Sequence, residues 1–89
     1  MSLEVAIDEL VRQISAASPS AVTRVTRVSD EEASLRAYAP ASDEAAIKAA
    51  TQEYTLQLLI GEGLDVQVLV YDLATSLPPD EWHGERVRR

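Results

Sequence analysis

The chain has 89 residues and a formal net charge of −7, with one histidine and no cysteine. This length predicts one small domain with a thin core, because chains of this size bury only about 60–65 % of their unfolded surface. The acidity argues against nucleic acid or an anionic membrane as a partner, and the lack of cysteine excludes disulfides, a thiolate nucleophile and a zinc–thiolate site.

Residues 3–17 form the first predicted element, an amphipathic helix. Its apolar residues recur at three- and four-residue steps and make one stripe: Leu3, Ile7, Leu10, Ile14 and Ala17, with Val11 beside it. Ser2 is placed to cap its start, and Ser18-Pro19-Ser20 ends it. The acidic polar face does not suit a bilayer surface, so we expect the stripe to face the core.

Two strands follow. Residues 21–28 are rich in β-branched residues, but their valines recur every third position, which predicts a bulge or an edge position, with Arg24 and Arg27 on opposite faces. Residues 29–32 supply turn chemistry. In residues 33–39 the inner face is Ala33, Leu35, Ala37 and Ala39, and the other face is Ser34, Arg36 and Tyr38.

The stretch from Ser42 to Asp72 organises the fold as a long helix, a glycine stop and an apolar strand. Ser42 is placed as the helix cap and Gly61 as the residue after its end, and one side carries Ala46, Ile47, Ala50, Tyr54 and Leu58. A competing interpretation makes Tyr54–Ile60 a strand, with residues 61–63 as a hairpin turn. The Ala, Gln, Glu and Leu content favours the helix.

The last strand, residues 66–73, is apolar on both faces. Val66, Val68 and Val70 line one face, and Leu69, Tyr71 and Leu73 line the other. Such a strand is expected to be covered on both sides. Two helices on one face of the sheet cannot cover the other, so we expect a second copy of the chain to do so. The competing interpretation is that residues 74–82, with Leu77 and Trp82, fold across the sheet and cover it within one chain.

These elements predict an α+β fold, a small αββαβ two-layer sandwich whose three-stranded sheet has two helices on one face. The second strand is expected at the centre, with the third parallel to it through a right-handed crossover. Residues 1–76 would form the domain and residues 77–89 a mobile C-terminal tail. The element order resembles the type II KH domain and the cytoplasmic domain of cation diffusion facilitators, but this chain lacks the Gly-x-x-Gly loop of the first and the metal-binding histidines of the second.

No catalytic, cofactor-binding or metal-binding residue is predicted. The single histidine, His83, has no second histidine or cysteine to complete a metal site or a nucleophile–base pair. We therefore expect no cofactor and a non-enzymatic, cytoplasmic interaction module. It would act as an adaptor or regulatory subunit, as a homodimer or with another protein as partner. The alternative is a regulatory domain that binds a small ligand on the sheet. The candidate interface residues are Arg36, Tyr38, Leu69, Tyr71, Leu73 and Trp82.

Overall fold

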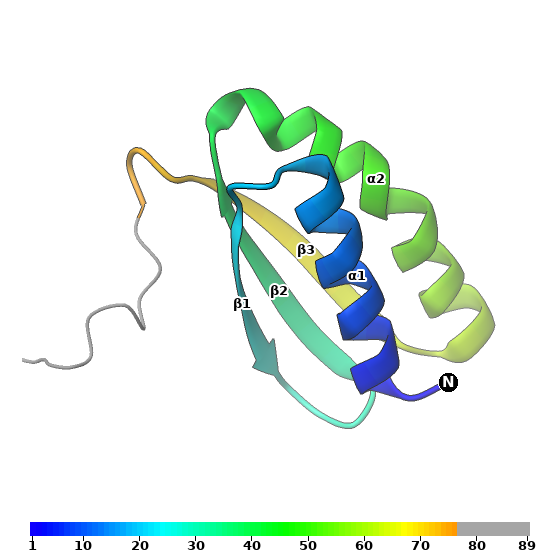
Figure 1. Ribbon diagram of the computed structural model, residues 1–89. Helices are drawn as coiled ribbons and strands as arrows, with labels where there is room; N and C mark the ends of the chain where they lie inside the picture. Colours follow the sequence, from blue (N-terminus) through cyan, green and yellow to red (C-terminus); the bar gives the residue numbers. More distant parts are fainter. Residues whose placement is uncertain (77–89) are drawn as a thin grey trace, which may run out of the picture.

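The computed structural model describes residues 1–76, and the predicted tail with Trp82 and His83 lies outside that range. The elements, in chain order, are α1 (Leu3–Ala17), β1 (Val22–Arg27), β2 (Glu32–Ala39), a 3₁₀ turn (Ala41–Asp43), α2 (Glu44–Gln57), a π-helical turn (Leu58–Glu62) and β3 (Asp65–Asp72). Both helices pack on the same face of the sheet (Figure 1). The predicted α+β fold class is confirmed.

The sheet has the order β1-β2-β3, so β2 lies at its centre as predicted. β1 pairs with β2 antiparallel, and β3 pairs with β2 parallel. The connection between β1 and β2 is a short turn in which the N–H groups of Val28 and Ser29 both donate to the carbonyl of Glu32, at 2.9 and 3.1 Å. β2 and β3 are joined instead through α2, because parallel neighbours need a long crossover.

α1 begins and ends where the sequence predicts. The Oγ atom of Ser2 accepts a hydrogen bond from the Val5 N–H at 3.2 Å, which satisfies one of the free donors at the helix start. At the other end the N–H of Ser18 donates to the Ile14 carbonyl at 2.8 Å. The predicted stripe is the buried face, and Ala6 joins it: the buried residues are Leu3, Ala6, Ile7, Leu10 and Ile14.

The helix prediction for residues 54–60 is confirmed, but both predicted ends of that helix are wrong. Ser42 does not cap α2, because it lies inside the 3₁₀ turn, and the N-cap position falls to Asp43 without a side-chain capping bond. Gly61 does not end the helix. The chain continues through it in a π-helical turn, and Gly63 takes the left-handed conformation with φ 68°.

The end of this π-helical turn has the hydrogen bonds of a helix C-terminus. The N–H groups of Gly63 and Leu64 both donate to the Leu58 carbonyl, the second at 3.0 Å. Leu58 and Leu64 are both buried in the core, as the apolar residues on either side of such a helix end often are. Extending the helix by this turn places Leu58 in the core while Leu59 and Ile60 remain exposed.

The core lies between the sheet and the helices, and β2 supplies its floor. The four inward residues of β2 are at most 1 % exposed: Ala33, Leu35, Ala37 and Ala39. Their small side chains let the helix layer approach closely. α2 contributes a narrow row in which Ile47 and Thr51 are buried, whereas Ala46 and Ala50, predicted on the inner side, are exposed. Thr51 tolerates burial because its hydroxyl donates to the Ile47 carbonyl at 3.0 Å.

β1 occupies an edge of the sheet. The irregular spacing of its valines predicted either an edge position or a bulge. Its register with β2 runs without interruption from Val22 to Arg27, so it carries no bulge. Arg24 and Arg27 lie on opposite faces, also as predicted. The side chain of Arg27 turns toward the helix layer and forms an ion pair with Glu4 of α1, Nη1 to Oε2 at 2.6 Å.

Candidate functional site

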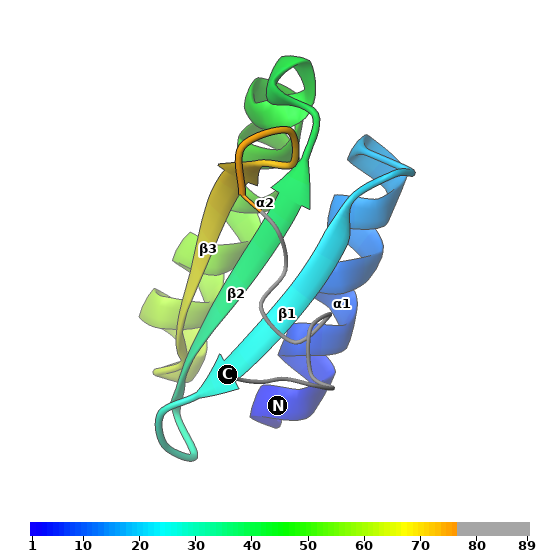
Figure 2. The same cartoon turned by 90° about the vertical axis from the view of Figure 1, so that its left-hand side faces the viewer.

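The second face of the sheet carries most of the residues that the sequence singled out. Figure 2 views the molecule with the sheet in front of both helices. Within residues 1–76 neither helix lies on this face, which we call the open face. By strand alternation and register it displays Val22, Arg24, Thr26, Glu32, Ser34, Arg36, Tyr38, Asp65, Gln67, Leu69 and Tyr71. Within residues 1–76 no element covers this side of β3, and Leu69 and Tyr71 are each 38 % exposed; that a second copy covers them stays a prediction.

Two tyrosines on the open face stack against each other. Tyr38 and Tyr71 are partners in the parallel register of β2 and β3. Their rings stack with centroids 5.3 Å apart and planes inclined by 22°. Tyr38 is only 4 % exposed, so Tyr71 presents the accessible ring. Stacked aromatic pairs contribute apolar area to an interface, and the hydroxyl of an exposed tyrosine can add a polar contact.

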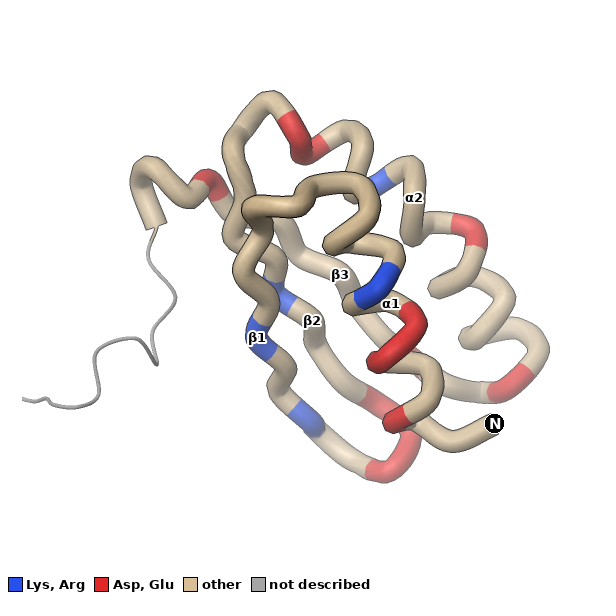
Figure 3. Tube along the Cα trace, in the orientation of Figure 1, with Lys and Arg blue, Asp and Glu red and all other residues tan. Residues whose placement is uncertain are grey.

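Arginines lie beside this aromatic pair. Arg24 of β1 is the register partner of Arg36 of β2, so the two side chains share the open face. Arg24 donates to the Thr23 carbonyl at 2.9 Å, and Arg36 makes a long contact to Thr26 Oγ1 at 3.5 Å. Figure 3 shows basic segments along β1 and β2, while acidic segments lie on the helices, the turns and the ends of the strands. The open face therefore carries Arg24 and Arg36 along its middle and two acids, Glu32 and Asp65, at the end where β2 and β3 begin.

The structure brings four of the six predicted interface residues together: Arg36, Tyr38, Leu69 and Tyr71. Leu73 comes one residue after β3 and is half-buried, and its N–H donates to the Ala39 carbonyl at 2.9 Å. It therefore extends the β2–β3 ladder by one residue. Trp82 lies outside the described residues.

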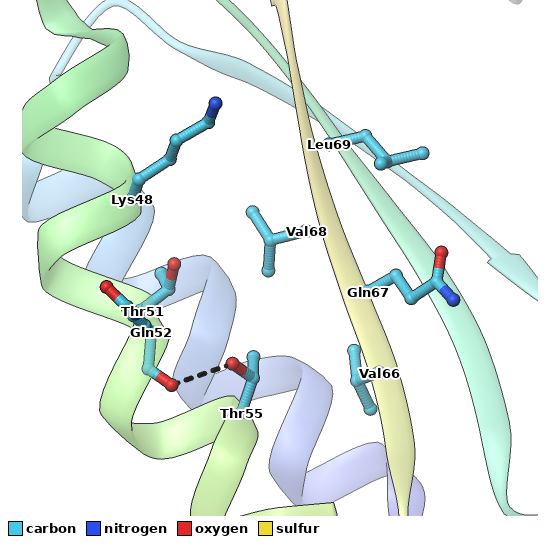
Figure 4. Close-up of a pocket in the computed structure, with 8 residues that line it drawn as sticks. All are labelled: Lys48, Thr51, Gln52, Thr55, Val66, Gln67, Val68 and Leu69. Carbon is cyan, nitrogen blue, oxygen red and sulfur yellow. Dashed lines mark hydrogen bonds between the residues drawn. The ribbon is translucent and has the colours of Figure 1, made fainter.

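A second surface was not predicted. A groove of about 510 Å³ runs between α2 and β3. Its lining consists of Lys48, Thr51, Gln52 and Thr55 from the helix and Val66, Gln67, Val68 and Leu69 from the strand. In Figure 4 the side chains of Val66 and Val68 point toward α2, whereas those of Gln67 and Leu69 point away from it. The polar residues on α2 recur at three- and four-residue steps, a pattern that the sequence carried but that equally fits a solvated helix face.

In the described part of the chain no group of three or more His, Cys, Asp or Glu side chains lies close enough to hold a metal ion. No helix among residues 1–76 has the length and apolarity needed to cross a bilayer.

No protein-family model matches the chain, and no curated protein or solved structure matches it. The fold and the surfaces define its class: a small α+β two-layer domain with helices on one face of the sheet and an exposed surface with a stacked tyrosine pair and two arginines on the other.

Proposed function

We propose that the chain is a non-enzymatic interaction module that forms a homodimer through its open face. The observation that carries this proposal is the exposed apolar and aromatic surface around Leu69 and Tyr71, on the face of the sheet that the helices leave open. Surfaces of this kind mark interaction sites when they are contiguous. Symmetry favours a second copy as the partner, because two-fold dimers are the commonest soluble oligomers and use one self-complementary patch.

The size of the face sets the expected affinity. Three strands about 4.8 Å apart and about 25 Å long present a surface of roughly 350 Å². Stable interfaces bury about 800 Å² per partner, so a dimer built on this face alone is expected to be weak. We therefore expect it to dissociate on dilution, with a dissociation constant in the micromolar range or above. The net charge of −7 opposes assembly at low ionic strength.

Light scattering over a concentration series tests this proposal. A mass that rises from 9.7 kDa toward twice that value with concentration is expected, and added salt should strengthen the association. Tyr71→Glu should abolish the rise while leaving the fold intact. Leu56→Glu is the matched control, because Leu56 is also an exposed apolar residue but lies on α2. A mass that stays at 9.7 kDa from tens to hundreds of micromolar would rule out the homodimer.

A small anionic ligand on the same face is the second candidate. The pairing of Arg24 with Arg36 favours it, because arginine side chains that share a face next to an aromatic pair suit a planar carboxylate or a phosphate ester. Titration with benzoate and with phenyl phosphate, followed by amide chemical shifts, tests this function. Shifts centred on Arg36 that disappear in Arg36→Gln would support a ligand site, and unchanged spectra at millimolar ligand would exclude it for these compounds.

A further inference from the structure

The outer edge of β3 carries backbone groups that the described chain does not pair. The N–H groups of Asp65 and Leu73 donate to the carbonyls of Glu31 and Ala39, at 2.8 and 2.9 Å. Both are odd-numbered, and the register with β2 is continuous between them. Since backbone groups alternate in direction along a strand, the odd-numbered residues point toward β2. The N–H and C=O groups of Val66, Val68 and Val70 therefore point away from the sheet.

This edge lacks the features by which proteins usually protect a terminal strand. β3 is eight residues long and contains no proline and no lysine. Its unbroken register shows no bulge that would twist it away. Its only charged residues, Asp65 and Asp72, stand at its two ends. Long, flat edges without such protection are templates for the addition of another strand.

The groove described above borders this edge. The same valines that direct their backbone groups outward direct their side chains toward α2, so Val66 and Val68 form one wall of the groove (Figure 4). An added strand would place alternate side chains between this wall and the helix. At about 510 Å³ the groove has room for two or three small apolar side chains of the size of valine or threonine.

Three of the four polar side chains on the helix wall of the groove already have partners, and Gln52 is the fourth. The hydroxyls of Thr51 and Thr55 donate to the carbonyls of Ile47 and Gln52, at 3.0 and 2.9 Å. The ammonium group of Lys48 lies 2.8 Å from the carboxylate of Glu44. The backbone edge of β3 is thus the main source of directional contacts for a ligand, which favours an extended peptide over a small polar molecule.

We propose that the edge of β3 and the adjoining groove bind an extended peptide segment of a partner protein, with small apolar side chains at alternate positions and basic residues at its ends. Charge complementarity selects this occupant. Asp65 and Asp72 flank the edge, and residues 1–76 hold five basic against twelve acidic side chains. A second copy of the chain fits less well, because it brings the same acidic surface.

The probe for this site is the acetylated and amidated peptide Arg-Thr-Val-Thr-Val-Thr-Val-Arg, titrated against the full chain. Amide chemical shifts should move along β3 and at Thr51 and Thr55, and fluorescence anisotropy of the labelled peptide gives its affinity. A peptide with both arginines replaced by glutamate tests the charge. A peptide methylated at every internal backbone nitrogen keeps the side chains but loses the donors, and it should bind at least about tenfold more weakly.

Variants of the protein test the geometry separately. Val68→Pro removes one outward N–H and should weaken binding about tenfold, yet it leaves the ladder to β2 intact, since proline is tolerated where the N–H faces outward. Thr55→Trp fills the groove and should weaken binding by a similar factor without touching β3. Ala46→Trp is the matched control, because Ala46 is exposed on α2 outside the groove, and it should bind normally.

Four results would overturn the proposal. Equal binding of the methylated and unmethylated peptides would show that backbone pairing is not involved. Shifts confined to Arg36 and Tyr71 would move the peptide to the open face. No binding of the arginine-flanked peptide at millimolar concentration, with the Val68→Pro and parent chains both folded and of equal mass, would exclude the site. A two-chain species that Val68→Pro dissociates would assign the edge to a second copy instead.

Discussion

The contact between Ser18 and Asp43 should contribute measurably to stability. The side chain of Ser18 is buried at the C-cap of α1, and its hydroxyl donates to Oδ2 of Asp43 at 2.6 Å. Asp43 lies at the N-cap of α2, so this one bond joins the end of the first helix to the start of the second across 25 positions of sequence. Removing the donor leaves a carboxylate that has lost its protein partner.

The expected cost follows from the burial of the two groups. Hydrogen bonds to charged groups contribute about 1.5–3 kcal/mol. Asp43 is half-exposed and can recover water, so the lower end applies, and Ser18→Ala should lower the free energy of unfolding by about 1.5 kcal/mol. In urea, with a slope of about 1 kcal/mol per molar for a chain of this size, the midpoint should fall by about 1.5 M.

A double-mutant cycle with Asp43→Ala isolates the bond. The coupling energy between the two positions should be about 1 kcal/mol, whereas Ser15→Ala, at an exposed serine of α1, should change stability by less than about 0.5 kcal/mol. Additive losses to within about 0.3 kcal/mol would refute the reasoning, because the cavity left by Ser18 would then explain its whole effect.

Three further predictions concern the end of α2. Gly63→Ala should destabilise the fold by about 1 kcal/mol because of its positive φ, whereas Gly61→Ala should stabilise it slightly, both by urea unfolding. Leu58→Ala should lower the free energy of unfolding by about 2–4 kcal/mol, because Leu58 is buried. Leu56→Glu should lower it by less than about 0.5 kcal/mol, because Leu56 is 54 % exposed. Similar losses in the two variants would contradict the helical register. Burial raises the pKa of Tyr54, and the carboxylates of Glu9 and Glu62 add to the effect. The free energy of unfolding should therefore fall as the pH rises through that raised pKa. Tyr54→Phe should reduce this loss in urea titrations at successive alkaline pH values.

The sequence predicted the elements well where a periodic signal lies within one element. The stripe from Leu3 to Ile14 marked α1 with its bounds, and the alternation from Ala33 to Ala39 marked β2. Such signals survive folding because each is caused by one buried face. The same reasoning brought Tyr38 and Tyr71 to one face before their stacking was known.

The ends of α2 were mispredicted because contacts distant in sequence decide them. Ser42 has the chemistry of a cap, but the chain enters the helix through a 3₁₀ turn, and Asp43 takes its hydrogen bond from Ser18. Gly61 has the chemistry of a helix stop, but the chain continues for a further turn, and Leu58 and Leu64 on either side of that turn are both buried. Local propensity does not report either requirement.

The groove escaped prediction for a similar reason. Its two walls, α2 and β3, are both readable from the sequence, but the space between them depends on how far the helix is set from the edge of the sheet. Which backbone groups of β3 face outward depends on its register with β2, and only the structure supplies that register.

The alternation along β2 also divides the strand between two kinds of evolutionary constraint. On one side Ala33, Ala37 and Ala39 lie under the helices with almost no exposed surface, so larger residues there would push the layers apart. On the other side Ser34 and Arg36 stand on the open face and can be exchanged with little effect on the fold. Descendants of such a chain can therefore acquire new partners by changing every second residue of a single strand.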